Sequence, residues 1–358
     1  MKGRLSNPIY RWDAISKLEK FLIAAVVMIL IIRTQLWLTN YPQLGGGSIH
    51  IAHLLWGGLF MLVAIWFSLI WVNRWARNVS AILGGIGFGF FIDELGKFIT
   101  EDNDYFFRPA APIIYLVFIV LFLVIRHLSG RIKVGPDMAL ANVLDLLPST
   151  VTGEFGHREK DEADELLQRA DRSDPRVVAV REYLETVELV PERPPTRSSR
   201  MIAKVRRALT DITEWRLFEP LVVTVLIAWA VTSVAGVLEV QFNFGGLIEK
   251  GGDLSSGTLE IVEWGRYISV LLSALFVGLG VWKMLRSDHQ AAYRHFTTAL
   301  LISIFLTRVF VFLEAQFAAV FGLGFDLLLL FAISALSARD RQQSERFKSG
   351  RPVASGAG

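Results

Sequence analysis

The sequence predicts an all-α polytopic membrane protein, with about eight transmembrane helices and a small cytoplasmic helical insert. The first observation is composition: the 358 residues are 53% hydrophobic and 20% charged, with a mean hydropathy of +0.43. A soluble domain carries roughly 25% charged residues. The other two observations are the recurrence of long apolar segments and the gathering of basic residues in alternate loops. The composition excludes a soluble enzyme, and the absence of cysteine excludes thiolate metal sites, cysteine nucleophiles and disulfides.

The apolar segments fall into two groups of four. A helix needs roughly 20 mostly apolar residues to cross the hydrocarbon core, and helices satisfy their own backbone there. The expected spans are residues 21–38, 51–72, 79–100, 111–126, 218–240, 261–285, 296–314 and 318–336. The expected domains are a first membrane unit (1–129), a cytoplasmic insert (130–216), a second membrane unit (217–338) and a disordered tail (339–358).

Loop charges predict the orientation. Basic residues precede the first span and follow the second, fourth, sixth and eighth, whereas the alternate loops are acidic or glycine-rich. Because cytoplasmic loops carry the excess of Lys and Arg, both termini are expected in the cytoplasm and the protein in the plasma (inner) membrane.

The amphipathic pattern of the insert predicts helices that contact the membrane surface. Residues 137–147, 158–172 and 175–189 read as short amphipathic helices. In residues 200–216, a basic face predicts a helix lying along anionic lipid headgroups. The insert offers a surface for a cytoplasmic protein partner; no nucleic-acid partner is expected, and a homo-oligomer stays open.

The two membrane halves resemble each other weakly. Residues 50–53 and 260–263 each open a helix with two spaced polar residues, and residues 91–94 correspond loosely to 312–314. A 4+4 parallel repeat would explain this. Chance similarity between apolar helices explains it equally well.

Ionisable residues inside the spans are functional candidates, because each costs several kcal/mol in a membrane. Those expected in the outer leaflet are Arg33, His50, His53, Asp93, Glu94, Lys97, Glu239, Glu260, Glu263, Arg266, Arg308 and Glu314. His50 and His53 share a helix face by their spacing, as do Glu260 and Glu263. Asp326, nearer the middle of the last span, either relays protons or caps a helix break after Gly322 and Gly324.

Imidazoles and carboxylates together match a borderline divalent metal such as zinc, iron or manganese. The candidate ligands are His50, His53, Asp93, Glu94, Glu260, Glu263 and Glu314. Two alternatives stay open for the same residues: an ion-pair network that only orients the helices, and a path for protons or cations. In the span at residues 79–100, the glycine run at positions 85, 87 and 89 predicts close packing against neighbouring helices.

Three short stretches carry a resemblance: His50-Ile51-Ala52-His53-Leu54-Leu55-Trp56-Gly57, Phe91-Ile92-Asp93-Glu94 and Asp102-Asn103-Asp104-Tyr105. They resemble motifs, HxxHxxWG and FxDE among them, of a scattered family of uncharacterised prokaryotic multi-pass membrane proteins. The resemblance covers roughly residues 45–108 well and the insert loosely, and it implies no activity.

The sequence therefore predicts transport or conduction of a small cation or proton through a His/carboxylate site in the outer leaflet. The first alternative is an intramembrane metal-dependent enzyme acting on a lipid or extracytoplasmic substrate. Its catalytic candidates are Asp93, Glu94 and Glu263, one of them a base beside metal-activated water. The second alternative is a non-catalytic subunit or scaffold.

Overall fold

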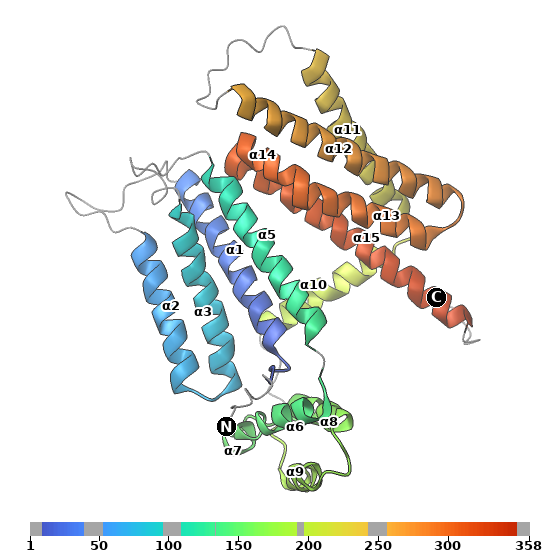
Figure 1. Ribbon diagram of the computed structural model, residues 1–358. Coiled ribbons are helices and arrows are strands. Elements are labelled where there is room, and N and C mark those ends of the chain that lie inside the picture. Colours follow the sequence, from blue (N-terminus) through green and yellow to red (C-terminus); the bar gives the residue numbers. More distant parts are fainter. Residues whose placement is uncertain are drawn as a thin grey trace, which may run out of the picture. The chain divides into compact units, whose positions relative to one another are not determined.

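The computed structural model describes residues 9–38, 53–95, 109–132, 134–191, 197–242 and 256–348, and these form helices with no strand (Figure 1). Helical runs long and apolar enough to cross a membrane are Arg74–Asp93, Ala110–Arg131, Phe218–Val237, Val262–Leu285 and His289–Arg341. The all-helical fold is confirmed, and five helical runs suit a membrane. A total of eight spans and the internal repeat stay predictions. The chain divides into two compact units.

The first unit comprises residues 1–110 and 116–194. Its helices are α1 (Ala14–Leu38), α2 (His53–Ile70), α3 (Arg74–Asp93), most of α5 (Ala110–Arg131), α6 (Pro136–Leu144), α7 (Pro148–Val151), α8 (His157–Arg169) and α9 (Pro175–Thr186). Helix α3 packs against both α1 and α2 (Figure 1). The short helices α6 to α9 form the insert.

The glycine run explains how α3 contacts two neighbours. A Cβ atom on Gly85 would lie 2.2 Å from the carbonyl oxygen of Phe21 in α1. A Cβ atom on Gly87 would lie 2.7 Å from the carbonyl oxygen of Gly57 in α2. Because both contacts are with backbone, only glycine allows the helices this close. The close packing predicted for the run is confirmed.

The insert has a hydrophobic core of its own. Val143, Phe155 and Leu166 are buried between its helices. The segment before α1 is held to this core by Asn142, whose Oδ1 accepts a hydrogen bond of 2.6 Å from the backbone N–H of Trp12. The insert and the start of α1 are therefore parts of one compact unit.

The second unit comprises residues 111–115 and 195–358. Its elements are α10 (Arg197–Glu214), α11 (Phe218–Phe242), α12 (Ser256–Leu285), α13 (His289–Ile302), the π-helical turn η2 (Ser303–Thr307), α14 (Arg308–Ala315), the 3₁₀ turn η3 (Gln316–Ala318) and α15 (Ala319–Lys348). The chain reverses at Gln316, where φ is 49°, so that α15 packs along α13. Leu226, Phe296, Leu300 and Ile333 are fully buried in the core.

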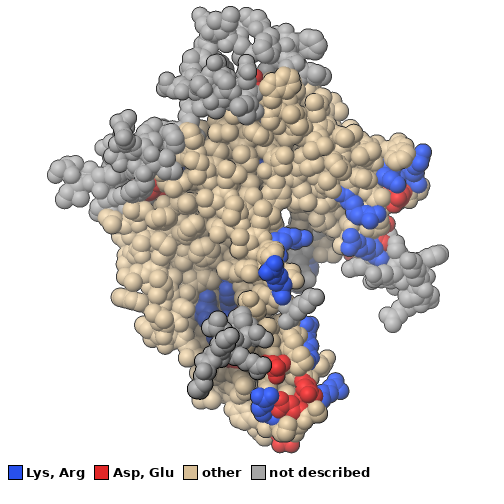
Figure 2. Space-filling view, in the orientation of Figure 1, with Lys and Arg blue, Asp and Glu red and all other residues tan. Residues whose placement is uncertain are grey.

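The surface of the long helices is apolar. Leu69 and Phe321, for example, are 78% and 86% exposed. In Figure 2, Lys, Arg, Asp and Glu gather over the insert and at the right of the view, while the surface along most of the long helices is uncharged in this view. A large exposed apolar surface on long helices indicates contact with a lipid bilayer.

Candidate functional site

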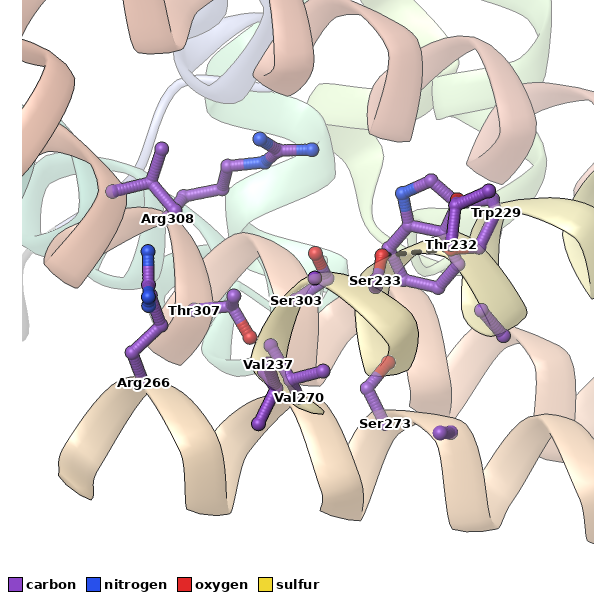
Figure 3. A pocket seen from close by; sticks show the side chains of 14 residues that line it. Trp229, Thr232, Ser233, Val237, Arg266, Val270, Ser273, Ser303, Thr307 and Arg308 are labelled. Carbon is purple, nitrogen blue, oxygen red and sulfur yellow. Dashed lines mark hydrogen bonds between the residues drawn. The ribbon is translucent and has the colours of Figure 1, made fainter. Parts of the chain in front are cut away.

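A cavity of about 260 Å³ lies within the second unit, between α11, α12, the turn η2 and α14. The polar side chains that line it are Thr232, Ser233, Arg266, Ser273, Ser303, Thr307 and Arg308, beside Trp229 and several small or apolar residues (Figure 3). Arg266 and Arg308 come from neighbouring helices at one end of the cavity, and Trp229 lies at the other (Figure 3). A polar cavity among apolar helices is the default binding-site hypothesis.

Asp326 of α15 is hydrogen-bonded to two residues that line this cavity. Its side chain is fully buried, and its two oxygens accept hydrogen bonds of 2.7 and 2.8 Å from Nε and Nη2 of Arg308. The hydroxyl of Ser303 donates a third bond, of 2.7 Å, to Oδ2. Such a bidentate pair is one of the stronger hydrogen-bonded contacts in proteins. Asp326 is therefore connected to the cavity by two of its lining side chains.

The backbone around Arg308 is arranged for this contact. Ser303, Thr307 and Arg308 emerge from, or directly after, the π-helical turn η2, and such turns are frequent at functional sites. The hydroxyl of Tyr115, a member of the second unit, donates to the carbonyl oxygen of Ile304 in this turn. A Cβ atom on Gly322 would lie 2.1 Å from Nη1 of Arg308, so glycine there makes room for the guanidinium.

Helix α15 runs without a break from Ala319 to Lys348. The interpretation of Asp326 as a cap after Gly322 and Gly324 is therefore wrong. Gly322 makes room for the partner of Asp326 instead of ending a helix.

The hydroxyl groups of the cavity form local chains. Thr307 Oγ1 donates to Ser269 Oγ at 3.0 Å, and Ser273 Oγ donates to the carbonyl oxygen of Ala299 at 2.9 Å. Since these protons are committed to the protein, the oxygens offer lone pairs, while the two arginines offer N–H donors. The cavity can therefore hold water or a small polar solute.

Three of the predicted site residues, Glu260, Glu263 and Glu314, belong to the second unit, and the side chains of Glu263 and Glu314 are described. Glu314 of α14 pairs with Arg266, and this contact is more exposed than that of Asp326, with 36% of the Glu314 side chain accessible. Glu263 is partly buried on α12, and its charge acts on Glu314. Arg266, three residues after Glu263, thus has its ion pair with α14.

Asp93 and Glu94 belong to the first unit, at the end of α3. Both are buried, and Arg33 of α1 donates to Oδ1 of Asp93 at 2.6 Å and to its carbonyl oxygen at 3.1 Å. This pairing joins α1 to α3. Lys97, another of the ionisable candidates, lies outside the described residues.

His50 lies outside the described residues, and the side chains of His53 and Glu260 are likewise not described. Among the residues that are described, no group of three or more His, Asp or Glu side chains is arranged to hold a metal ion. The metal site over His50, His53, Asp93, Glu94, Glu260, Glu263 and Glu314 stays a prediction.

Sequence reasoning missed the hydroxyl groups of the cavity. The signal was present: Ser269 and Ser273, and likewise Ser303 and Thr307, are spaced four residues apart within apolar spans. That spacing puts each pair on one helix face. It also missed the pairing of Arg308 with Asp326, because the two residues lie on different helices.

Searches against protein-family models, curated proteins and solved structures find no match for this chain.

Proposed function

We propose that the protein couples proton movement to the transport of a small polar solute across a membrane. In this proposal Asp326 carries the proton and the cavity of the second unit holds the solute. The observation that carries it is a fully buried carboxylate whose partners, Arg308 and Ser303, both line a polar cavity. Carboxylates within membrane helices are costly and mark proton relays and substrate paths.

The Arg308–Asp326 ion pair would couple protonation of Asp326 to binding of the solute by Arg308. While Asp326 is ionised, it engages Arg308 through two hydrogen bonds. A proton that binds one carboxylate oxygen removes the negative charge, which weakens the pair and leaves the guanidinium able to bind a solute oxygen. Loss of the proton restores the pair and expels the solute. A charge change acting on a two-state contact is a common switch.

The charge of the cavity supports a proton over a metal cation. Two arginines and no carboxylate are among the described residues that line it. A bare metal ion would meet positive charge there, whereas a proton is accepted by Asp326, which is hydrogen-bonded to two of the lining residues.

The proposal includes the topology expected from the loop charges. The protein would span the inner membrane eight times, with both termini and the insert in the cytoplasm. The basic loops support this orientation through the excess of Lys and Arg on the cytoplasmic side.

The proposal is tested by measuring proton flux into vesicles that contain the purified protein and are loaded with a pH-sensitive dye. A pH gradient should drive protein-dependent proton flux, and Asp326→Asn should abolish it. Asp340→Asn is a matched control, because it makes the same change on α15 at a residue whose hydrogen-bond partner, Gln290, does not line the cavity. Flux that survives Asp326→Asn would contradict the proposal.

Ser303→Ala separates transport from folding. This change keeps the Arg308–Asp326 pair and removes only the hydroxyl between Asp326 and the cavity, so flux should fall while thermal stability changes little.

Elemental analysis of the same preparations examines the enzyme alternative. Stoichiometric zinc, iron or manganese that is lost in His53→Ala would favour the metal-dependent enzyme.

A further inference from the structure

The first unit holds a second polar cavity, of about 460 Å³, between the start of α1, α3 and the insert. Lys17 and Lys20 of α1, with Arg74 at the start of α3, line one wall. Glu154 and Glu159 of the insert also line the cavity. It lies at the end of α1 that the loop charges predict to face the cytoplasm.

Two ammonium groups converge in this cavity on a neutral partner. Nζ of Lys17 and Nζ of Lys20 donate to the same oxygen, Oδ1 of Asn78, at 2.7 and 2.6 Å. Lys17 also pairs with Asp13 at 3.1 Å, whereas no carboxylate of the described residues lies within 4.0 Å of the Lys20 ammonium. Since an ammonium carries three donors, Lys20 retains donors for a ligand.

Arg74, Glu162 and Asp13, which also line the cavity, are already engaged, and Arg158 of the insert adds one more cation to the lining. Arg74 forms two hydrogen bonds of 2.9 Å with Glu162. Burial opposes the charge of Asp13, but the hydrogen bond and charge of Lys17 outweigh it and hold the pKa of Asp13 below its usual value. Burial lowers the pKa of Lys17, and the positive charges of Lys20 and Arg74 add to this effect against the pull of Asp13. An anion beside the two lysines would relieve that repulsion.

The insert contributes negative charge to the same cavity. Glu159 accepts a hydrogen bond of 3.1 Å from the backbone N–H of Gly156. Glu154 accepts a long hydrogen bond, of 3.4 Å, from Nδ2 of Asn73. The cavity therefore presents ammonium groups from helix α1, and from the insert two carboxylates and the guanidinium of Arg158.

An apolar groove of about 350 Å³ begins at the same lysine. Lys20 lines both hollows, and the groove continues along Ile23, Val27 and Ile31 of α1 and Ile82 and Ile86 of α3. Residues 20–31 of a helix span about 16 Å at 1.5 Å per residue. That is close to half of the roughly 30 Å hydrocarbon core, the thickness of one leaflet.

We propose that the first unit binds one phospholipid with an amine-bearing headgroup. Its phosphate lies against Lys17 and Lys20, its amine faces Glu154 and Glu159, and one acyl chain occupies the groove along α1 and α3. The order of charges is that of the lipid itself, with phosphate nearer the apolar chain and amine farther out. A free phosphate would leave both the groove and the carboxylates unused.

Native mass spectrometry of the full-length protein tests this site. Delipidated protein is offered equal amounts of phosphatidylethanolamine, phosphatidylglycerol and phosphatidylcholine with identical chains. One phosphatidylethanolamine should bind per chain in preference to the others. Lys20→Gln should weaken this binding about tenfold, the effect of losing one charged hydrogen bond. Lys20→Arg keeps the charge and should retain binding, which separates the charge from any folding defect.

Three further variants examine each part of the site. Glu154→Gln should abolish the preference for the amine headgroup without weakening the binding of phosphatidylglycerol. Val27→Trp fills the groove and should reduce binding, whereas Val26→Trp, on the adjacent position outside the groove, should not. Arg131→Gln, an exposed basic residue at the end of α5, should have no effect.

Several results would overturn the proposal. Equal binding of the three lipids would remove the headgroup assignment. Equal losses in Lys20→Gln and Arg131→Gln would show general attraction to charge. Binding of soluble glycerophosphoethanolamine as tight as that of the lipid would exclude a role for the groove.

Discussion

At the scale of single residues, Arg308 and Asp326 depend on each other. The carboxylate is fully buried and the guanidinium 13% exposed, so neither charge has much access to water. Removing one member of a desolvated pair leaves the other charge uncompensated. Replacing both with apolar side chains avoids that penalty.

We therefore predict that Arg308→Ala lowers the free energy of unfolding by about 3–5 kcal/mol. The double variant Arg308→Met/Asp326→Leu should recover most of this loss, because it leaves no unpaired charge. Thermal unfolding in detergent measures both effects. Arg266→Ala is the comparison, since its partner Glu314 is more exposed; a partly exposed pair should cost about 1 kcal/mol or less. Additive losses in the double variant would contradict the coupling.

At the scale of elements, α3 is held by contacts that only glycine permits. Gly85 and Gly87 on α3 meet backbone atoms of α1 and α2, so their replacement requires whole helices to move. Gly58 on α2 has no atom within 4 Å of the position of a Cβ. The two kinds of glycine therefore differ in what an added methyl group meets.

Gly85→Ala should destabilise the protein by about 1–3 kcal/mol, the usual cost of overpacking. Gly58→Ala should be neutral, or stabilising by up to about 1 kcal/mol, because alanine favours helix over glycine. Thermal unfolding of the two variants, side by side, is the measurement. A loss in Gly58→Ala equal to that in Gly85→Ala would mean that the close contact with Phe21 is not what matters.

At the scale of the whole molecule, the distribution of charge predicts how the chain lies in the membrane. The insert, with its acidic and basic helices, is expected in the cytoplasm, and the loop at residues 40–50 outside. The cysteine-free sequence makes this testable, because a single introduced thiol is the only reactive one.

With an impermeant thiol reagent on intact cells, Ser48→Cys should be labelled and Ser173→Cys protected. Lysed cells should show labelling of Ser173→Cys, since Ser173 lies on an exposed part of the insert. The reverse pattern, with Ser173→Cys labelled in intact cells, would overturn the orientation.

Composition and local pattern were enough to predict the helical class, because hydrophobic length and helical periodicity are properties of consecutive residues. The glycine run at 85–89 predicted close packing for the same reason: a missing side chain is visible in the sequence. The short helices of the insert also follow from local signals, such as Pro136 and Pro175 at helix starts.

Pairing across helices was decided only by the tertiary structure. Asp326 lies 18 residues from Arg308, and Asp93 lies 60 residues from Arg33, so no helical spacing links them. The lining of the cavity likewise comes from α11, α12 and the stretch from the π-helical turn into α14, which are separate in the sequence. A sequence gives the charges that need partners; which of them meet depends on how helices pack, since packing places residues distant in the chain side by side.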